Sequence, residues 1–414
     1  MKFDTIIIGG GLSGLLCGIS LLEKGNHCAI ITTGQSALHF FSGSFDFMSY
    51  SNDNNVENVL DGISQLPKSH PYSIIGEANV KSLLNDVKPI FSRMGVELKG
   101  DVNKNHYRIT PSGNIRPTLF SLSEFPVLDN VHQLPWANIS LQNVDGFLDF
   151  NTSFIAEGLE KIGAKCSLSS FSLPELDMIR KSPTEMRSTN IARILDNYDE
   201  LMRIAPIIEK NSGESDVILL PAVFGLHNPD AFSLFKSFIS KPVYLLPAIP
   251  PSVSGIRTQI QMKNYFQKLG GVFMLGDTVT GGIIEKSQLR SITTINHSDI
   301  SLKADNFILA SGSFFSRGIK ADMDRIYEPI FDLDVNTELK RDKWCDINFF
   351  NSQPFMSFGV KVDDKFNTQF KVNSISNLYA IGSIVGGSNP IKEGCGAGVS
   401  ILSALHIANQ IAGK

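Results

Sequence analysis

Three glycines near the start of the sequence have the spacing of a nucleotide-binding turn. Gly9, Gly11 and Gly14 form Gly-x-Gly-x-x-Gly between an apolar run, Thr5–Ile8, and leucines at helical spacing. The first glycine of such a turn permits the bend, the second lets the backbone approach a phosphate, and the third allows close helix–strand packing. The following helix offers free N–H groups to a pyrophosphate. We therefore predict a dinucleotide site here, and the alternative is a tight turn without a ligand.

The position that should bind the ribose carries no acid. An Asp or Glu about 20 residues on normally holds the ribose hydroxyls, but here the second apolar run ends in Thr32-Thr33. A threonine hydroxyl can serve as both donor and acceptor. Thr32 is therefore the ribose candidate, and the identity of the nucleotide stays open.

The elements around this turn should form a complete βαβ unit. Thr5–Ile8 reads as a buried strand, the leucines as a helix that ends at Gly25, and residues 28–31 as a second strand. Elements of the same kind are expected later in the chain. They are strands at 139–141, 216–220, 272–275, 304–309 and 377–381, helices at 152–162, 260–269 and 396–412, and an antiparallel meander at 283–285, 289–295 and 300–302.

Composition limits the possible functions. The 414 residues suffice for two or three domains, and the net charge of -4 without a basic block argues against nucleic-acid binding. Five isolated cysteines without a Cys-x-x-Cys pair predict no iron–sulfur cluster and no metal in this chain, and they fit a reducing, cytoplasmic setting. A strand at the very start leaves no room for a leader, and no apolar run approaches the ~20 residues that span a bilayer. We expect membrane contact only through partners.

The distant segments resemble those of the flavoprotein family that includes fumarate reductase. The resemblance rests on the glycine turn, on Ile308–Gly312 and on Asn377–Gly382, and it departs at Ser383, where such proteins carry an acid. It implies an α/β Rossmann-type FAD/NAD(P)-binding fold, with a parallel sheet and an antiparallel meander, built from residues 1–50, 245–315 and 372–414. Residues 51–244 and 316–371 would form an inserted α+β cap or partner-docking region.

Longer strings resemble the B subunits of bacterial anaerobic glycerol-3-phosphate dehydrogenases. These strings span the chain and include Gly34–Phe40, Leu173–Asp177, Asn190–Arg193, Pro250–Val253, Ala310–Phe315 and Gly394–Gly396. The resemblance implies a flavin subunit at the cytoplasmic face of the inner membrane, associated peripherally. It would relay electrons between an FAD-containing catalytic A subunit and an iron–sulfur C subunit.

The resemblance also implies FMN, whereas a Gly-x-Gly-x-x-Gly turn is built for the pyrophosphate of FAD. Both flavins therefore remain open. Two other functions also remain: a self-sufficient flavin oxidoreductase of a small acid, and a non-redox scaffold whose nucleotide site has decayed.

Flavin contacts are expected in three places along the chain. Ser42, Gly43 and Ser44 could donate to the N5 or O4 edge of the ring, or form an ordinary polar turn. Gly312, Gly382 and Ser383 follow two strands. Before the last helix lie Glu393, Gly394 and Gly396, where helix N–H groups can face the flavin C2 carbonyl and stabilise charge on the reduced ring.

Three residues are weak catalytic candidates. His39 lies in a loop whose histidine is bonded to flavin in the fumarate-reductase relatives, but its offset is one residue short, which favours an ordinary loop histidine. Arg257 and Arg317 could each bind a phosphate or carboxylate, although surface arginines are commoner. The sequence identifies no general base.

Overall fold

The computed structural model describes residues 2–182 and 184–413, which divide into two compact units. Unit 1 comprises Met1–Ala37, Asp46–Gly95 and Gln261–Lys414, and unit 2 comprises Leu38–Phe45 and Val96–Ile260. Each unit contains its own sheet, and helix α10 (Val253–Lys268) carries the boundary between them.

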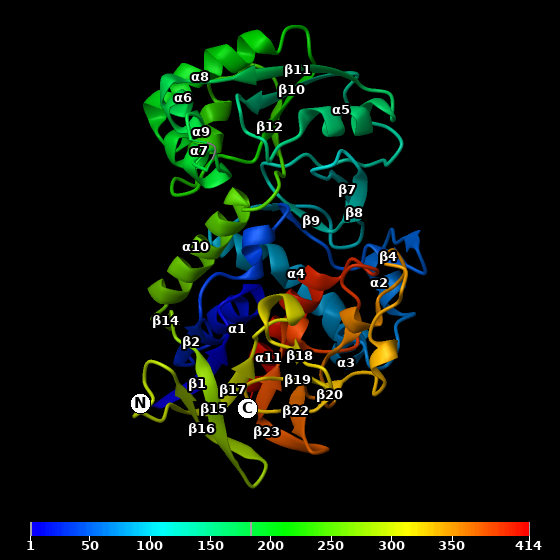
Figure 1. Cartoon of the computed structure of the whole chain (residues 1–414), viewed down its shortest axis with the longest axis vertical. Coiled ribbons are helices and arrows are strands. Elements are labelled where there is room, and N and C mark those ends of the chain that lie inside the picture. The colour runs from blue at the N-terminus through cyan, green and yellow to red at the C-terminus, as the bar shows by residue number, and fades with distance from the viewer. Residues whose placement is uncertain (1, 183, 414) are drawn as a thin grey trace. The chain divides into compact units, whose positions relative to one another are not determined.

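Unit 1 contains a six-stranded sheet in the order β14-β2-β1-β17-β23-β22. Its strands are β1 (Lys2–Ile8), β2 (Cys28–Thr32), β14 (Val272–Leu275), β17 (Lys303–Leu309), β22 (Asn367–Phe370) and β23 (Asn373–Ala380). All neighbouring pairs are parallel except β22 with β23. Figure 1 shows that segments from both ends of the chain, blue β1 and orange β23, belong to this sheet. The Rossmann-type fold predicted from the glycine turn is therefore present.

The centre of this sheet forms because its strands can be buried on both faces. Ile6, Ile7 and Ile8 of β1 are at most 4% exposed, and every residue of β2 is buried. Each such aliphatic side chain contributes about 1.5–3 kcal/mol by leaving water. Because β2 and β17 flank β1 on opposite sides, the strand order reverses at β1, and the carboxyl ends of β1 and β17 mark the crevice where such sheets bind ligands.

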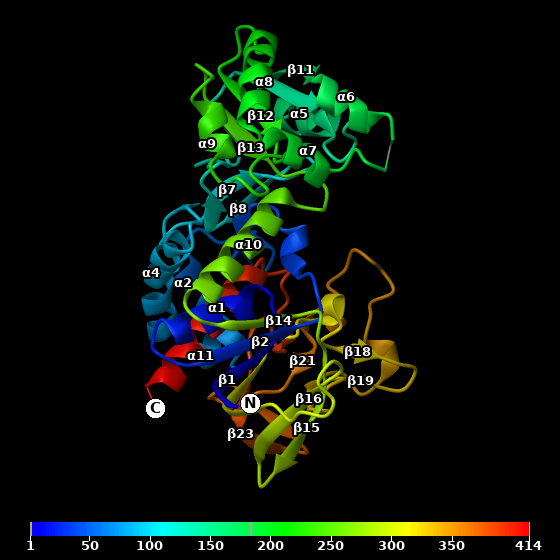
Figure 2. The ribbon, with the colours of Figure 1, turned by 90° about the vertical axis from the view of Figure 1, so that its left-hand side faces the viewer.

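Helices α1 (Leu12–Leu22) and α11 (Gly396–Ala412) pack against each other in unit 1, as Figure 2 shows. A methyl group on Gly18 of α1 would lie 2.7 Å from Phe266 and 3.1 Å from Ile7, so the missing side chain lets α1 lie close to its neighbours. The smaller elements of unit 1 are β4 (Tyr50–Ser51), β5 (Asn54–Asn55), α2 (Val59–Ile63), α3 (Pro71–Ile75), α4 (Glu77–Arg93), β18 (Lys320–Ala321), β19 (Ile326–Tyr327), β20 (Val335–Asn336) and β21 (Gly359–Val360).

The predicted antiparallel meander is a hairpin with one additional bridge. Strands β15 (Val279–Glu285) and β16 (Gln288–Thr294) pair antiparallel. The third predicted strand, residues 300–302, makes only an isolated bridge between Leu302 and Ile292. That segment follows a polar loop and provides only one residue in register, which is too short for a strand.

Unit 2 is built on a parallel sheet in the order β11-β10-β12-β13. These strands are β10 (Asn138–Val144), β11 (Lys165–Phe171), β12 (Val217–Pro221) and β13 (Val243–Leu246). The helices of this unit are α5 (Thr152–Glu160), α6 (Pro174–Arg180), α7 (Ser188–Leu195), α8 (Tyr198–Asn211) and α9 (Ala231–Lys236). Short antiparallel strands complete it: β3 (Ser44–Phe45), β6 (Leu98–Lys99), β7 (His106–Ile109), β8 (Ile115–Thr118) and β9 (Phe120–Leu122). The inserted region thus has a parallel α/β core in addition to antiparallel pairs.

The units divide the chain differently from the sequence prediction. Residues 51–95 and 316–371, predicted in the cap, belong to unit 1, while residues 38–45 and 245–260 belong to unit 2. Long-range contacts account for both differences: Arg93 makes a two-bonded ion pair with Glu23, and the Ser252 N–H donates to the His39 carbonyl at 2.8 Å. Such contacts leave no local sequence pattern. Among the described helices, none combines the length and apolar character needed to cross a bilayer.

Candidate functional site

The predicted glycine turn joins β1 to α1, and its glycines have different neighbours. Gly9 has φ +119°, and a Cβ there would lie 2.2 Å from the Ala310 carbonyl oxygen of the β17 end. A Cβ on Gly14 would lie 2.0 Å from the Gly9 oxygen. At Gly11 the nearest atom would be Ser36 Cβ at 3.6 Å, an ordinary contact. The chain's own packing therefore requires Gly9 and Gly14, whereas Gly11 leaves space that a ligand could use.

The first turn of α1 presents backbone donors beside that space. Gly11 is the N-cap and provides no side-chain cap, and its carbonyl accepts from Leu15 N at 2.9 Å. The N–H groups of residues 12–14 have no acceptor within residues 2–182 and 184–413. Unpaired N–H groups and the positive end of the helix dipole together favour an anion such as a pyrophosphate.

The carboxyl ends of β17 and β23 lie next to the glycine turn. After β17, Ser311 has a buried Oγ atom with no hydrogen-bond partner among the described residues, and Gly312 has φ +84°. A Cβ on Gly312 would lie 3.8 Å from Ser383 Oγ, which places the turn after β23 beside it. Gly312 and Ser383, predicted from separate parts of the sequence, are thus brought together. An orphaned buried hydroxyl here is consistent with a polar ligand.

Helix α11 packs against the turn after β23. Gly382 (φ +73°) follows β23, and a Cβ on it would lie 2.5 Å from Ser13 Oγ of α1 and 3.6 Å from Ser400 Oγ of α11. Gly382 therefore lies between the first turn of α1 and the second turn of α11. In α11 the Gly398 N–H donates to Asp46 O, whereas those of Gly396 and Ala397 find no acceptor in the described part of the chain. Unpaired N–H groups at a helix amino terminus favour an anion, and both α1 and α11 carry them.

Thr32 lies at the carboxyl end of β2, where a ribose contact is expected. Its side chain is 8% exposed and lies 2.9 Å from the Cβ position of Gly10. The hydroxyl donates to Gly34 O at 3.4 Å, a long bond within its own loop. The Thr32 hydroxyl could exchange that weak bond for a ligand.

The Glu393 carboxylate, predicted to contact the cofactor, binds groups of the chain itself. Its Oε2 atom accepts from three donors: the backbone N–H of Asn389 at 3.0 Å, His70 Nε2 at 3.3 Å and the Cys395 thiol at 3.2 Å. This carboxylate oxygen therefore already accepts hydrogen bonds from three groups of the chain. Gly394, with φ +58°, packs against Ser49 rather than leaving open space. No sequence signal indicated His70, which is distant along the chain.

This cluster has the composition of a metal site, because His70, Glu393 and Cys395 place their ligand atoms within 4.8 Å of one another. The hydrogen bonds argue against that use. Tyr72 N donates to His70 Nδ1 at 3.1 Å, so Nε2 carries the ring proton and donates to Glu393. A metal at Nε2 would require the proton to move to Nδ1, where it would face the Tyr72 N–H.

The loop of Ser42, Gly43 and Ser44 belongs to unit 2. Ser42 and Ser44 have their Oγ atoms 3.3 Å apart, and Ser44 pairs with Ser121 in the β3–β9 ladder. Gly43 has φ +83° and its missing side chain accommodates the ring of Phe125. These contacts give the loop a structural role within its unit, and its proposed contact with flavin stays a prediction.

His39 and Arg257 are also held within unit 2. Burial lowers the pKa of the partly buried His39, and its side-chain hydrogen bond with Gln259 opposes that shift. Arg257 is 7% exposed, forms an ion pair with Glu124, and donates to Phe224 O at 3.2 Å. Burial lowers the pKa of Arg257 to about 10. Its guanidinium is buried and already paired with Glu124, and the role of Arg257 in binding an anion stays a prediction.

Arg317 is exposed in unit 1. It closes the short helix Phe314–Ser316 with φ +62°, and the structure gives its side chain no hydrogen-bond or ion-pair partner among the residues it describes. It lies five residues after Gly312, and remains available to an anion or a partner protein.

Comparison with known proteins agrees with this geometry. A family model described as "FAD binding domain" matches residues 4–399. A Yersinia enterocolitica protein, named as the B subunit of anaerobic glycerol-3-phosphate dehydrogenase, is 41% identical, over 99% of this chain and 98% of its own. Proteins of the same name from Pectobacterium atrosepticum and Actinobacillus pleuropneumoniae are 39% and 36% identical, over at least 99% of each chain. The chain belongs to this family of B subunits. It is a flavin-dependent oxidoreductase subunit.

The residues of unit 1 fit a flavin. Gly11 leaves room for the close approach of a phosphate, the first turns of α1 and α11 offer unpaired N–H groups, and Ser311 provides a buried hydroxyl without a partner among the described residues. The two acids common in such proteins are replaced by Thr32 and Ser383. Hydroxyls can bind the same sugar oxygens, but without a charge they bind them less strongly.

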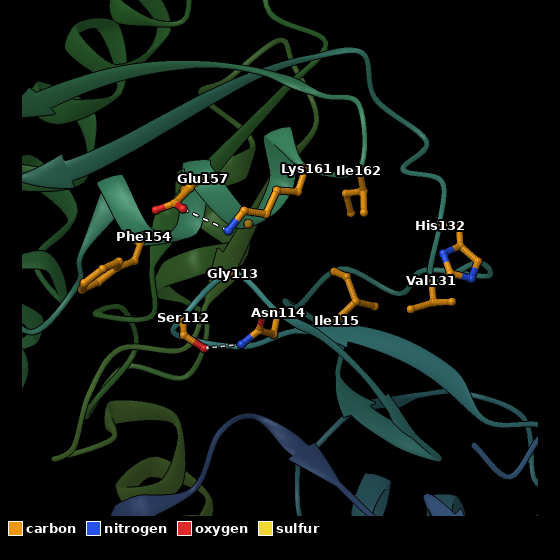
Figure 3. A pocket seen from close by; sticks show the side chains of 11 residues that line it. Ser112, Gly113, Asn114, Ile115, Val131, His132, Phe154, Glu157, Lys161 and Ile162 are labelled. Atoms are coloured by element: carbon orange, nitrogen blue, oxygen red, sulfur yellow. Dashed lines mark hydrogen bonds and ion pairs between the residues drawn. The ribbon is translucent and has the colours of Figure 1, made fainter. Parts of the chain in front are cut away.

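A separate hollow of about 540 Å³ lies in unit 2, between the β7–β8 turn and α5. Figure 3 shows that its walls include Asn114 on one side and Glu157 and Lys161 on the other. Lys161 and Glu157 form an exposed ion pair at 2.9 Å. None of the residues predicted to bind flavin lines this hollow.

Proposed function

We propose that this B subunit acts in an anaerobic glycerol-3-phosphate dehydrogenase, where its flavin passes electrons from a catalytic A subunit to an iron–sulfur C subunit. The observation that carries the proposal is the full-length match to relatives of that name, over 99% of this chain. A match of this extent includes both units, so it covers the surfaces that would contact other subunits as well as the flavin turn.

The arrangement around the glycine turn suits a relay. A relay must hold a flavin and stabilise its reduced, more negative form. Unpaired helix N–H groups can stabilise the added negative charge, and this task requires neither a proton donor nor a substrate pocket. The α11 groups of Gly396 and Ala397 are in position to serve that purpose.

We further propose that the flavin is FAD. Gly9 and Gly14 are required by the packing of the turn, but Gly11 is not, and a glycine there is explained by a pyrophosphate close to the backbone. FMN has a single phosphate and no pyrophosphate, so it would use less of this turn than FAD does.

The first test is the visible spectrum of the purified chain, followed by mass analysis of the small molecule released by heat. A flavin spectrum and released FAD support both proposals. Released FMN would overturn the choice of FAD while leaving the relay intact. A colourless protein that takes up neither flavin would favour the scaffold alternative.

The second test separates a relay from a self-sufficient enzyme. The purified chain is assayed with glycerol 3-phosphate and a dye acceptor, alone and after addition of the A subunit. We expect activity only with the A subunit present. Full turnover by the single chain would overturn the assignment of roles.

Peripheral attachment at the cytoplasmic face of the inner membrane is part of the same proposal. We expect the chain to sediment with membranes when the A and C subunits are co-expressed. It should remain in the supernatant when the C subunit is omitted, and membrane binding without that subunit would contradict attachment through a partner.

A further inference from the structure

The cluster of His70, Glu393 and Cys395 lies directly before the first turn of α11. Cys395 is the N-cap of that helix, yet its side chain does not cap the helix and donates instead to Glu393 at 3.2 Å. His70 is 0% exposed and donates from Nε2 to the same carboxylate oxygen. The chain thus places a partly buried carboxylate three residues before Gly396, whose N–H group is unpaired in the described part of the chain.

The protonation states of the cluster are fixed by its contacts. Burial raises the pKa of the Cys395 thiol well above its usual value, so sulfur keeps its proton and acts as a donor. Burial also raises the pKa of Glu393, but the hydrogen bond from His70 and the other donors outweigh it, and the net shift is downward. The carboxylate is therefore ionised and is held by three donors.

Glu393 also joins three segments of unit 1. While its carboxylate binds His70, the Glu393 carbonyl accepts from Ser49 N at 2.9 Å and from Tyr50 N at 3.0 Å. Tyr72, two residues after His70, donates from Oη to Phe47 O at 2.6 Å. A Cβ on Gly398 would lie 2.0 Å from that Oη atom. The first turn of α11 therefore cannot shift without breaking contacts to α3 and to residues 47–50.

We propose that His70 and Glu393 are positioning residues that hold the first turn of α11 against the flavin, so that its unpaired N–H groups stabilise the reduced cofactor. This inference rests on the flavin site proposed above. Its physical basis is that the effect of a helix terminus falls off within about one turn. A small displacement of Gly396 and Ala397 would therefore weaken both flavin binding and the stabilisation of the added charge.

The most informative variant is His70→Asn. It removes the donor to Glu393 but keeps a side-chain acceptor at the N-cap of α3. Two asparagines in this chain cap helices in that way, because Asn58 accepts from Leu60 N and Asn197 accepts from Asp199 N, both at 2.9 Å. The carboxylate and its charge remain. A change in flavin properties would therefore reflect the placement of the α11 turn rather than the loss of a charge.

Asp334→Asn is the matched control. Asp334 also accepts two backbone N–H groups, from Lys371 at 3.2 Å and Val372 at 2.7 Å. Those residues form the turn before β23, at the opposite end of the strand from Gly382. Eight residues of strand separate the two ends by roughly 25 Å. The control thus loses a similar interaction far from the nucleotide end of the sheet.

The experiment measures the flavin dissociation constant and the reduction potential of the full chain loaded with flavin. For His70→Asn we expect the affinity for flavin to fall about tenfold. We also expect its reduction potential to fall by about 30 mV, which lowers the ratio of reduced to oxidised flavin about tenfold for a two-electron couple. Asp334→Asn should change neither quantity. Cys395→Ser, which keeps a donor, should stay close to wild type, and Cys395→Ala should shift both in the direction of His70→Asn.

An unchanged potential in both His70→Asn and Cys395→Ala would overturn the inference, and so would an equal shift in Asp334→Asn. If His70→Asn does not fold, the comparison of Cys395→Ala with Cys395→Ser decides the question alone. A wild-type chain that binds no flavin would instead refute the proposed function, so the two failures can be told apart.

Discussion

A methyl group added at Gly14 would lie 2.0 Å from the Gly9 oxygen, whereas one added at Gly11 would meet nothing closer than Ser36 at 3.6 Å. The two glycines of one motif thus serve different partners. Gly14 is needed by the packing of helix on strand, whereas the glycine at position 11 is explained by our proposal of a ligand that approaches the backbone. Gly11 has φ -84°, which any residue can adopt, so its backbone gives no reason for glycine.

Substituting these glycines should separate folding from binding. Gly11→Ala should change the free energy of unfolding by less than about 1 kcal/mol, because the added methyl group meets no close neighbour. It should weaken flavin binding by at least about tenfold through contact with the phosphate. Gly14→Ala should lower stability and expression instead. Thermal melting and flavin titration of both variants check this, and unchanged flavin affinity in Gly11→Ala would argue against a pyrophosphate at the turn.

The ion pair of Arg257 and Glu124 allows a second test at this scale. Replacing Arg257 by Met leaves the largely buried Glu124, 11% exposed, without its ion-pair partner, and we expect a loss of about 3–5 kcal/mol in the stability of unit 2. The double variant with Glu124→Leu should recover much of that loss. Chemical unfolding of the three proteins measures it. A fully stable Arg257→Met variant would show that the arginine is held for binding instead.

At the scale of elements, the nucleotide end of unit 1 was predictable because its signals are local. The glycine turn, the strand before it and the final helix each carry a short pattern, and α11 has the bounds that its sequence predicts. The interaction of Glu393 with His70 was not predictable, since the two residues are 323 positions apart. The pairing of Arg257 with Glu124 was missed for the same reason, because these residues are also far apart in the sequence.

The connection from β14 to the β15–β16 hairpin depends on one buried carboxylate. Asp277 is 3% exposed and accepts from Thr278 N at 2.8 Å, Asn296 N at 3.1 Å and His297 Nδ1 at 2.9 Å. Burial raises the pKa of Asp277, but the hydrogen bonds to its carboxylate, including one from the Thr294 side chain, outweigh burial and hold the pKa below its usual value. Its contribution to stability is therefore fully present above the unfolded pKa and is lost as the pH falls through the lower folded value.

Asp277→Asn should lower the stability of unit 1 by about 1–3 kcal/mol at neutral pH, because an amide cannot accept all of these donors. The difference from wild type should shrink as the pH falls below 3.8. Urea unfolding at a series of pH values measures it. A difference that stays constant into acid would mean that the ionised carboxylate is not the cause.

At the scale of the whole molecule, the flavin fold could be inferred from sequence but its division into units could not. Parallel strands far apart in the chain share a pattern of apolar residues bounded by glycines, and that pattern survives long insertions. The boundaries depend on contacts such as Arg93 with Glu23, which no local pattern records.

The two units should respond differently to flavin. The glycine turn and both helix termini belong to unit 1, so saturating flavin should stabilise that unit by about 2.7 kcal/mol at a hundredfold excess over its dissociation constant. Calorimetry of the chain should then show one transition that shifts with flavin and one that does not. If both transitions shift, the loop of Ser42, Gly43 and Ser44 in unit 2 also contacts the cofactor, as the sequence prediction holds.

The central position of β1 has a consequence for biosynthesis. Its neighbour β2 is made at once, but its other partner, β17, begins at Lys303. At a ribosomal rate of roughly 5–20 residues per second, β1 would wait roughly 15–60 s for that partner. Helix α11, which completes the flavin-facing end, is translated later still, from Gly396 onward. Cofactor loading must therefore follow the synthesis of that helix, and in the interval an apolar strand with an open edge is a natural client for a chaperone.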